Sequence, residues 1–90
     1  MITSFQMRAA RALLGIDQKT LAELAGVSLP TIQRMEASTG NVRGVVETLI
    51  KVVEAFERAG VELIGEQVRS ESGGRGVRLR EPGPPRRVGA

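Results

Sequence analysis

Hydrophobic residues recur at helical spacing in four stretches of the first 60 residues, and the first stretch covers about residues 5–14. Thr3 and Ser4 lie just before it and offer side-chain oxygens that can cap the start of a helix. Gly15 suits the position just past the end of a helix, where the backbone often turns left-handed. The pattern therefore predicts a first helix over residues 5–14.

Two short helices follow, because cap signals come close together along the chain. Asp17 is an N-cap candidate for a helix of barely two turns that ends before Gly26. Ser28 can cap a third helix over about residues 28–37, and Pro30 is tolerated in its first turn, where no backbone N–H partner is required. Ile32 and Met35 lie three positions apart, so they are expected on its inward face.

The fourth helix and the segment after it have different patterns. Residues 45–58 form an apolar-rich helical stretch that Gly60 closes, whereas residues 61–68 begin with β-favouring side chains. Residues 70–76 read as a loop, and residues 77–80 alternate apolar with basic, so they can return as a second strand. The sequence leaves open whether this strand pairs within one chain or between two chains. Residues 81–90 are rich in Pro, Gly and Arg and are expected to be disordered.

These elements predict a mainly α fold, in which four helices are followed by a short C-terminal β-strand or hairpin. Residues 1–60 would form the helical domain, residues 61–80 a hairpin that is a possible dimerisation element, and residues 81–90 a tail. The fourth helix has more apolar residues than a single core-facing stripe requires. We expect one set to face the core of the chain: Val46, Leu49, Val53 and Phe56. A second set, together with the strand near Leu63, is then available for a dimer contact: Val45, Ile50 or Val52. Alternatively, the hairpin covers this face within one monomer.

The composition excludes most enzyme chemistry. The 90 residues contain no Cys and no His, which removes disulfides, thiolate nucleophiles, imidazole bases and nearly every zinc or haem site. We therefore expect no enzyme activity, no cofactor and no metal. No apolar run approaches the roughly 18 residues of a membrane span, and no secretion signal is visible, so a cytoplasmic protein without membrane contact is expected.

The distribution of charge is more informative than the net charge of +3, which comes from 13 basic and 10 acidic residues. Residues 1–45 have five basic residues against three acidic ones, and residues 46–68 have two against five. The remaining residues, 69–90, have six arginines against two glutamates. Most of the positive excess thus lies in the tail, and charge alone is a weak indication of nucleic-acid binding.

The two short helices and the turn between them, Gly26-Val27-Ser28, form a helix-turn-helix pattern. Residues 15–36 resemble the Cro and phage-repressor (XRE-type) helix-turn-helix family, and the similarity extends over about residues 5–58. The residues that carry it are Gln18, the Leu21-Ala22 pair, Gly26, Ser28, Ile32 and Glu36. The combination is specific, although each residue alone is a weak signal.

The resemblance implies that the third helix enters the major groove of double-stranded DNA. It assigns a phosphate contact to Gln18 and base reading to the exposed start of the third helix: Ser28, Leu29, Pro30, Thr31, Gln33 and Arg34. Backbone contacts at the flanks fall to Lys19, Asn41 and Arg43, with Arg8 nearby. Arg11 and Glu36 match a family pair that joins the first helix to the end of the third through a buried ion pair. For each of these polar side chains, the alternative is an ordinary cap or a solvated surface position.

The leading hypothesis is a sequence-specific transcriptional regulator, most simply a homodimeric repressor that reads half-sites about one DNA turn, roughly 34 Å, apart. One alternative is an antitoxin-type regulator, whose tail over residues 69–90 neutralises a protein partner. Another is an anti-activator, which uses the apolar face of the fourth helix to bind another regulator. Double-stranded DNA and a second copy are therefore the expected partners, and a different protein is a possible one.

Overall fold

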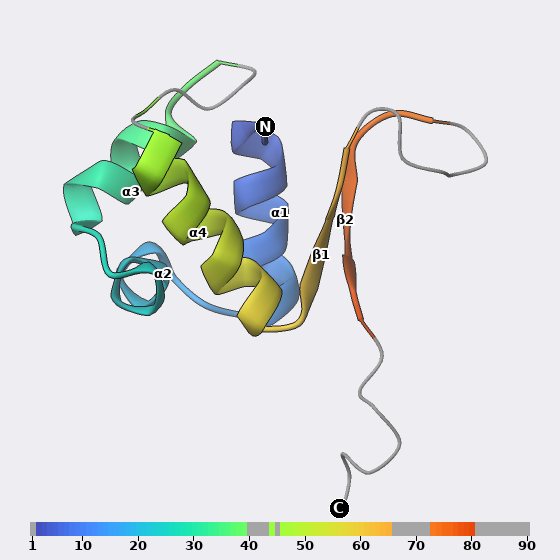
Figure 1. Ribbon diagram of the computed structural model, residues 1–90, viewed down its shortest axis with the longest axis horizontal. Helices are drawn as coiled ribbons and strands as arrows, with labels where there is room; N and C mark the ends of the chain where they lie inside the picture. Colours follow the sequence, from blue (N-terminus) through green and yellow to red (C-terminus); the bar gives the residue numbers. More distant parts are fainter. Residues whose placement is uncertain (1, 40–43, 45, 66–72, 81–90) are drawn as a thin grey trace, which may run out of the picture.

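The computed structural model describes residues 2–39, 44, 46–65 and 73–80. It contains four helices and one antiparallel hairpin, as the sequence predicts (Figure 1). The elements in chain order are α1 (Ser4–Leu14), α2 (Gln18–Ala25), α3 (Leu29–Glu36), α4 (Val46–Arg58), β1 (Val61–Ile64) and β2 (Gly76–Leu79). Residues 81–90, which the sequence predicts to be disordered, lie outside the described residues. So do residues 70–72 of the predicted loop.

Side-chain caps define the first three helices. Thr3, Asp17 and Ser28 accept hydrogen bonds from the backbone N–H groups three residues further on. Two glycines, Gly15 and Gly26, end α1 and α2 with left-handed backbone at φ values of 68° and 70°. Only glycine adopts this region at no steric cost, so the chain can reverse within a few residues after α1 and after α2.

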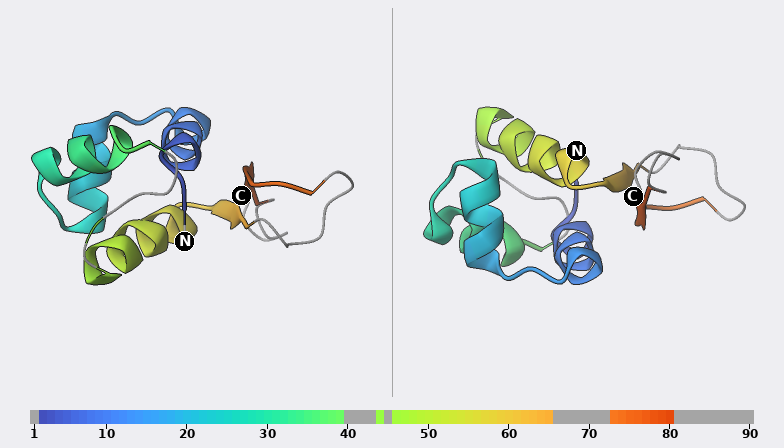
Figure 2. Two further views of the ribbon diagram at one scale, coloured as in Figure 1. Left: turned by 90° about the horizontal axis from the view of Figure 1, so that it is seen from above. Right: turned by 90° about the horizontal axis from the view of Figure 1, so that it is seen from below.

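The core is aliphatic, and Phe56 is the aromatic ring inside it. The buried hydrophobic residues come from the segment before α1, from all four helices and from β1: Ile2, Met7, Ala10, Leu21, Ala22, Ala25, Ile32, Met35, Leu49, Val52, Ala55, Phe56 and Val61. α1 contacts α3 on one side and both strands on the other, while α4 contacts α2 and β1 (Figure 2). This arrangement leaves α3 and the hairpin on opposite sides of α1.

The orientation of α4 corrects one part of the sequence interpretation. Val52, which was assigned to a dimer contact, is fully buried, and Val46, which was assigned to the core, is 62% exposed. The reason is helical phase, since Val52 lies on the same face as Leu49 and Phe56, whereas Val46 is the first residue of α4. Ile50 is exposed as expected, and Val45 lies outside the described residues.

The hairpin pairs within one chain. β2 runs antiparallel to β1, with Val61 opposite Leu79 and Leu63 opposite Val77. Val61 is fully buried, while Leu63 and Val77 are partly buried against the core. The opposite face of the hairpin carries the ion pair between Arg78 and Glu62, at 2.9 Å. The strands therefore pack beside α1 and α4.

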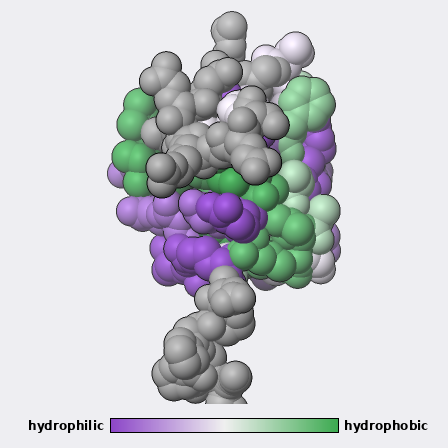
Figure 3. Space-filling model, turned by 90° about the vertical axis from the view of Figure 1, so that its right-hand side faces the viewer, coloured by the Kyte–Doolittle hydropathy of each residue, from purple (hydrophilic) through white to green (hydrophobic). Residues whose placement is uncertain are grey.

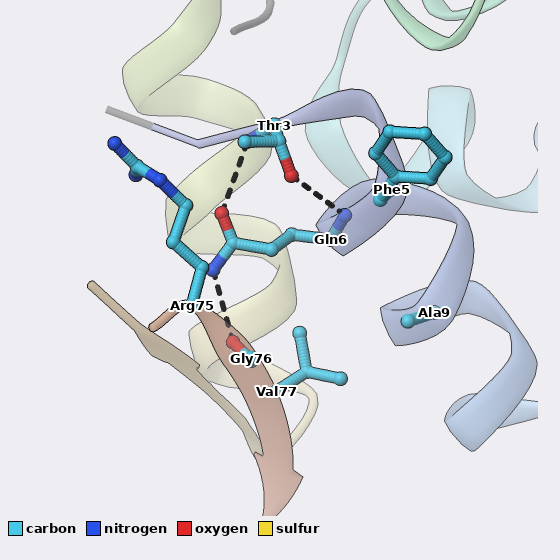
Figure 4. Close-up of a pocket in the computed structure, with 7 residues that line it drawn as sticks. All are labelled: Thr3, Phe5, Gln6, Ala9, Arg75, Gly76 and Val77. Atoms are coloured by element: carbon cyan, nitrogen blue, oxygen red, sulfur yellow. Dashed lines mark hydrogen bonds between the residues drawn. The ribbon is translucent and has the colours of Figure 1, made fainter. Parts of the chain in front are cut away.

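A buried amide fixes the hairpin on α1. The side-chain Nε2 of Gln6 donates to the carbonyl oxygen of Ile64 at 3.0 Å. It also donates to the carbonyl oxygen of Gly76 at 2.9 Å (Figure 4). Its Oε1 accepts from the backbone N–H of Thr3 at 3.0 Å, completing a capping box at the start of α1. One side chain thus caps the helix and joins it to both strands.

Within the described ranges, none of the helices has the length and apolar character required to cross a membrane.

Candidate nucleic-acid interface

The α2–α3 turn presents α3 with one face buried and one face outward. Ile32 and Met35 are buried, while Pro30, Gln33 and Arg34 are exposed, as predicted. The N–H of Val27 donates to the carbonyl of Ala22 at 3.0 Å, which closes the turn after α2. The outward face of α3 is therefore polar and held by a rigid two-helix unit.

Polar groups at the start of α3 form hydrogen bonds with one another in the helix cap. Ser28 Oγ accepts from the N–H of Thr31 at 3.2 Å and lies 2.8 Å from the Thr31 hydroxyl. Pro30 has no N–H, so this helix start offers fewer backbone donors to an anion than a typical one. Leu29 and Thr31 are half-buried. Among the predicted contact residues here, Ser28 and Pro30 are the exposed ones.

The side chains of Gln33 and Arg34 project from the middle of α3. Within the described part of the chain, neither side chain has a hydrogen bond or an ion pair. A guanidinium has five N–H donors in a fixed planar arrangement, and an amide has both donor and acceptor atoms. The two side chains therefore keep all their hydrogen-bonding capacity for a ligand outside the chain.

The start of α2 carries a capping carboxylate. Asp17 Oδ1 accepts from the N–H of Thr20 at 2.7 Å, and this hydrogen bond lowers the pKa of the Asp17 carboxyl below its ordinary value. The group is exposed and negatively charged, which opposes a phosphate at the same helix end. Lys19 lies beside it and is exposed, with an ammonium group that no described residue pairs.

The side chain of Gln18 forms a hydrogen bond within the molecule. Its side-chain Nε2 donates to Glu36 Oε1 at 3.1 Å, and the residue is half-buried. An amide nitrogen has two N–H groups, so this bond leaves the second one available. The sequence interpretation of Gln18 as a phosphate contact did not include this bond to the end of α3.

The ion pair expected between Arg11 and Glu36 is present. Arg11 Nε lies 2.7 Å from Glu36 Oε2, and its second terminal nitrogen lies 2.7 Å from Oε1, so the pair is bidentate. The Glu36 side chain is 3% exposed and the Arg11 side chain 20%. The hydrogen bond to Glu36 raises the pKa of Arg11, against the opposing effect of burial. The pair fixes the end of α3 on α1.

Arg8 joins the same cluster through the backbone. Its guanidinium donates to the carbonyl of Glu36 and lies 4.9 Å from the centroid of the Phe5 ring. A cation at the C-terminal end of α3 complements the helix dipole. The sequence placed Arg8 among the residues flanking the groove, and only the general preference for cations at helix ends indicates its role here. Asn41 and Arg43, two predicted backbone contacts, lie outside the described residues.

The chain was compared with models of known protein families. A family model described as helix-turn-helix matches residues 7–63, which include all four helices apart from the first residues of α1. No curated protein matches the chain. The matched range contains the capped α2–α3 unit and the cluster around Glu36.

Proposed function

Because the chain belongs to the XRE-type helix-turn-helix family of DNA-binding regulators, we propose that it represses transcription as a homodimer with α3 in the major groove. The single observation that carries the proposal is the outward face of α3, where Gln33 and Arg34 keep their full hydrogen-bonding capacity. A repressor of this kind works by occupying its operator, so the chain requires no catalytic group.

Arg34 has the central role in base reading. A guanidinium can donate to both O6 and N7 of guanine, and Gln33 can pair in a bidentate way with adenine. Leu29 supplies apolar contact to a thymine methyl group. Ser28, Pro30 and Thr31 lie at the edge of the same surface and complete the contact set.

Backbone contacts position α3 without reading sequence. Lys19 supplies a charge, and the second amide N–H of Gln18 donates to a phosphate while the first holds Glu36. Asn41 and Arg43 are proposed to contact the neighbouring backbone. Through Glu36, Gln18 is linked to Arg11, so the phosphate contact and the attachment of α3 to α1 share one carboxylate. We place the protein in the cytoplasm with the DNA it binds.

The test compares two variants that remove the same charge from exposed positions. Arg34→Ala removes the proposed guanine contact, and Lys51→Ala removes one positive charge from the outer side of α4. The wild type first selects its binding sites from a random duplex library, and the affinity of all three proteins for the selected duplex is then measured. Arg34→Ala is expected to lose about 10-fold to 100-fold in affinity, since a bidentate base contact contributes roughly 1 to 3 kcal/mol.

Lys51→Ala is expected to bind the selected duplex like the wild type, and both variants should fold normally because neither side chain is buried. Equal affinities for all three proteins would contradict the role of α3. If Arg34→Ala instead kept binding to a protein partner while DNA binding of the wild type was absent, the antitoxin or anti-activator hypothesis would be favoured.

A further inference from the structure

The end of α3 differs from the ends of α1 and α2. Those two helices end at glycines with left-handed backbone, whereas the residue after α3, Ala37, is right-handed, with φ −84° and ψ −7°. A left-handed cap supplies N–H groups to the last carbonyls of a helix, which otherwise have no partner within it. The last turn of α3 therefore requires other hydrogen-bond donors.

Backbone N–H groups serve two of the last four carbonyls of α3. The N–H of Ala37 donates to the carbonyl of Gln33 at 3.0 Å, and the N–H of Ser38 donates to the carbonyl of Met35 at 3.2 Å. Both donors lie directly after the helix. These two bonds therefore depend on the path by which the chain leaves α3.

Side chains serve the other two carbonyls. The hydroxyl of Ser38 donates to the carbonyl of Arg34 at 3.3 Å, and the guanidinium of Arg8 donates to the carbonyl of Glu36. Arg8 belongs to α1, so the last carbonyl of α3 is held from another helix. Each of the last four carbonyls of α3 thus accepts a hydrogen bond, although the helix has no glycine cap.

Phe5 supports the guanidinium of Arg8. The two residues are three positions apart on α1, and the guanidinium carbon of Arg8 lies 4.9 Å from the centroid of the Phe5 ring. Phe5 is 69% exposed, so its ring adds little to the core. The side of the molecule that carries the hairpin likewise shows hydrophobic residues directly beside strongly hydrophilic ones (Figure 3). The exposed ring restricts the positions that the Arg8 guanidinium can adopt.

These contacts act on the turn that carries the proposed base-reading side chains. Gln33 and Arg34 belong to the last four residues of α3, and the carbonyl of Arg34 is one of those held by a side chain. α3 has only eight residues, so its own hydrogen bonds hold it weakly. A base contact requires well-aligned hydrogen bonds of about 2.7 to 3.2 Å. A loose last turn would therefore move the Arg34 guanidinium away from a base edge without unfolding the protein.

Arg8 is better suited to orienting α3 than to stabilising the fold. Arg8 is exposed, whereas the side chain of Glu36, which is bonded to Arg11, is 3% exposed. An exposed charged contact adds little to the free energy of unfolding. Removal of the Arg8 guanidinium should therefore loosen the last turn of α3 while the chain stays folded.

We propose that Arg8 and Ser38 are positioning residues for base reading, which close the last turn of α3 and hold Arg34 in its contact with guanine. The ring of Phe5 keeps Arg8 in place for this role. The proposal rests on the proposed function, and it gives Arg8 a role within the chain in place of the flanking DNA contact that the sequence indicates.

The test compares Arg8→Met with Lys19→Met, each of which removes one positive charge. Affinity is measured over a range of salt concentrations for the selected duplex and for the same duplex with the guanine read by Arg34 replaced. The wild type should favour the selected duplex about 10-fold to 100-fold. Arg8→Met should lower this preference by about 5-fold or more and keep the salt slope, because a positioning residue contacts no phosphate. Lys19→Met should keep the preference and lower the salt slope by about one.

The double variant Arg8→Met with Arg34→Ala shows whether Arg8 acts through Arg34. Arg34→Ala alone should already lack the guanine preference, so the second substitution should not change it further. Ser38→Ala should lower the preference less than Arg8→Met, because the donor that it removes is neutral. Thr39→Ala removes a hydroxyl from the next, exposed position and should bind like the wild type.

Amide hydrogen exchange tests the same contacts without DNA. In Arg8→Met, the N–H groups of Ala37 and Ser38 should exchange faster, while that of Val27, which closes the turn after α2, should exchange as in the wild type. Faster exchange in a protein whose wild type binds no DNA would refute the proposed function and leave the contacts at the end of α3 standing.

Three results would overturn the proposal and leave the proposed function standing. They are an unchanged guanine preference in Arg8→Met, a salt slope lowered as much in Arg8→Met as in Lys19→Met, and unchanged exchange at the end of α3. An equal effect of Arg8→Met with and without Arg34 would also overturn it, since Arg8 would then act on DNA binding by another route.

Discussion

α3 and the hairpin are both attached to α1, but the chemistry of the two attachments differs. α3 is held by the charged pair between Arg11 and Glu36, with 2.7 Å contacts on both carboxylate oxygens. The hairpin is held by the neutral amide of Gln6, which donates to one carbonyl of each strand. A buried ion pair fixes orientation and is costly to break. A hydrogen bond from a neutral side-chain amide to a backbone carbonyl contributes less to the free energy of unfolding.

The surfaces beyond these attachments also differ. α3 presents polar side chains, including Gln33 and Arg34. The side of the molecule formed by α1 and the hairpin instead exposes the apolar side chains of Phe5, Leu13 and Leu79. Polar donors suit the edges of bases, and a contiguous apolar surface suits another protein surface. The two parts that α1 holds therefore differ both in the chemistry of their attachment and in the chemistry of their exposed surface.

The largest expected effect is that of Glu36→Ala. It leaves the Arg11 guanidinium, whose side chain is 20% exposed, without its carboxylate partner. The free energy of unfolding should fall by roughly 3 kcal/mol, the lower end of the range for buried pairs because Arg11 keeps some solvent contact. Denaturant unfolding measures this, with Glu54→Ala at an exposed position of α4 as control.

An unchanged unfolding curve for Glu36→Ala would contradict the attachment of α3 through the ion pair. Replacing both partners by apolar residues, as Arg11→Met with Glu36→Leu, should restore part of the lost stability. DNA binding by that double variant should still be weaker than in the wild type, because Gln18 loses its acceptor at Glu36.

A smaller effect is expected for Gln6→Ala, which removes the amide between α1 and the hairpin. The N–H of Thr3 loses its side-chain acceptor and the carbonyls of Ile64 and Gly76 lose a donor. We expect a loss of about 1 to 2 kcal/mol in the free energy of unfolding, since the groups lost are neutral. Gln33→Ala, which removes an exposed amide, should have almost no effect.

If Gln6→Ala proved as stable as Gln33→Ala, the Gln6 amide would make no contribution to holding the hairpin on α1. Amide hydrogen exchange sharpens this test. Exchange at β1 and β2 should become faster in Gln6→Ala, while exchange in α3 stays the same, because α3 is held by a separate attachment.

The smallest effect concerns the exposed cap of α2 and its pH dependence. The hydrogen bond from the N–H of Thr20 lowers the pKa of Asp17 in the folded chain below its ordinary value of 3.8. A carboxyl with a lowered folded pKa adds stability above its unfolded pKa, and this contribution is lost as the pH falls through the folded pKa. Stability should therefore decline slightly in the acid range below about pH 4.

Asp17→Asn keeps a cap but removes the titration, so it is the matched control. The difference in unfolding free energy between wild type and Asp17→Asn should vary with pH only in this acid range. A carboxyl titration of Asp17 by NMR that gave an ordinary or raised pKa would show that the cap is not formed in solution.

The helices could be predicted from the sequence because their ends carry local signals. Thr3, Asp17 and Ser28 cap them, and Gly15 and Gly26 end two of them. The pair between Arg11 and Glu36 was recognisable because the family pattern includes it, and the resemblance is confirmed by the family match.

The remaining contacts depend on residues far apart in the chain. Gln6 bonds to residues 58 and 70 positions away, and no local pattern distinguishes this amide from an exposed one. The burial of Val52 in place of Val46 depends on where α4 begins relative to the core, which the apolar pattern alone does not determine. The bond between Gln18 and Glu36 likewise follows from the packing of α2 on α3.

Parallel selection of binding sites by the wild type and by Arg34→Ala tests the central claim most directly. Both proteins are incubated with the same random duplex library, and the sequences they retain are compared. The wild type is expected to enrich a recurring motif containing guanine, and Arg34→Ala is expected to lose the preference at that guanine position while other positions keep theirs. Enrichment of no motif by the wild type, or of the same motif with the same guanine preference by both proteins, would contradict it.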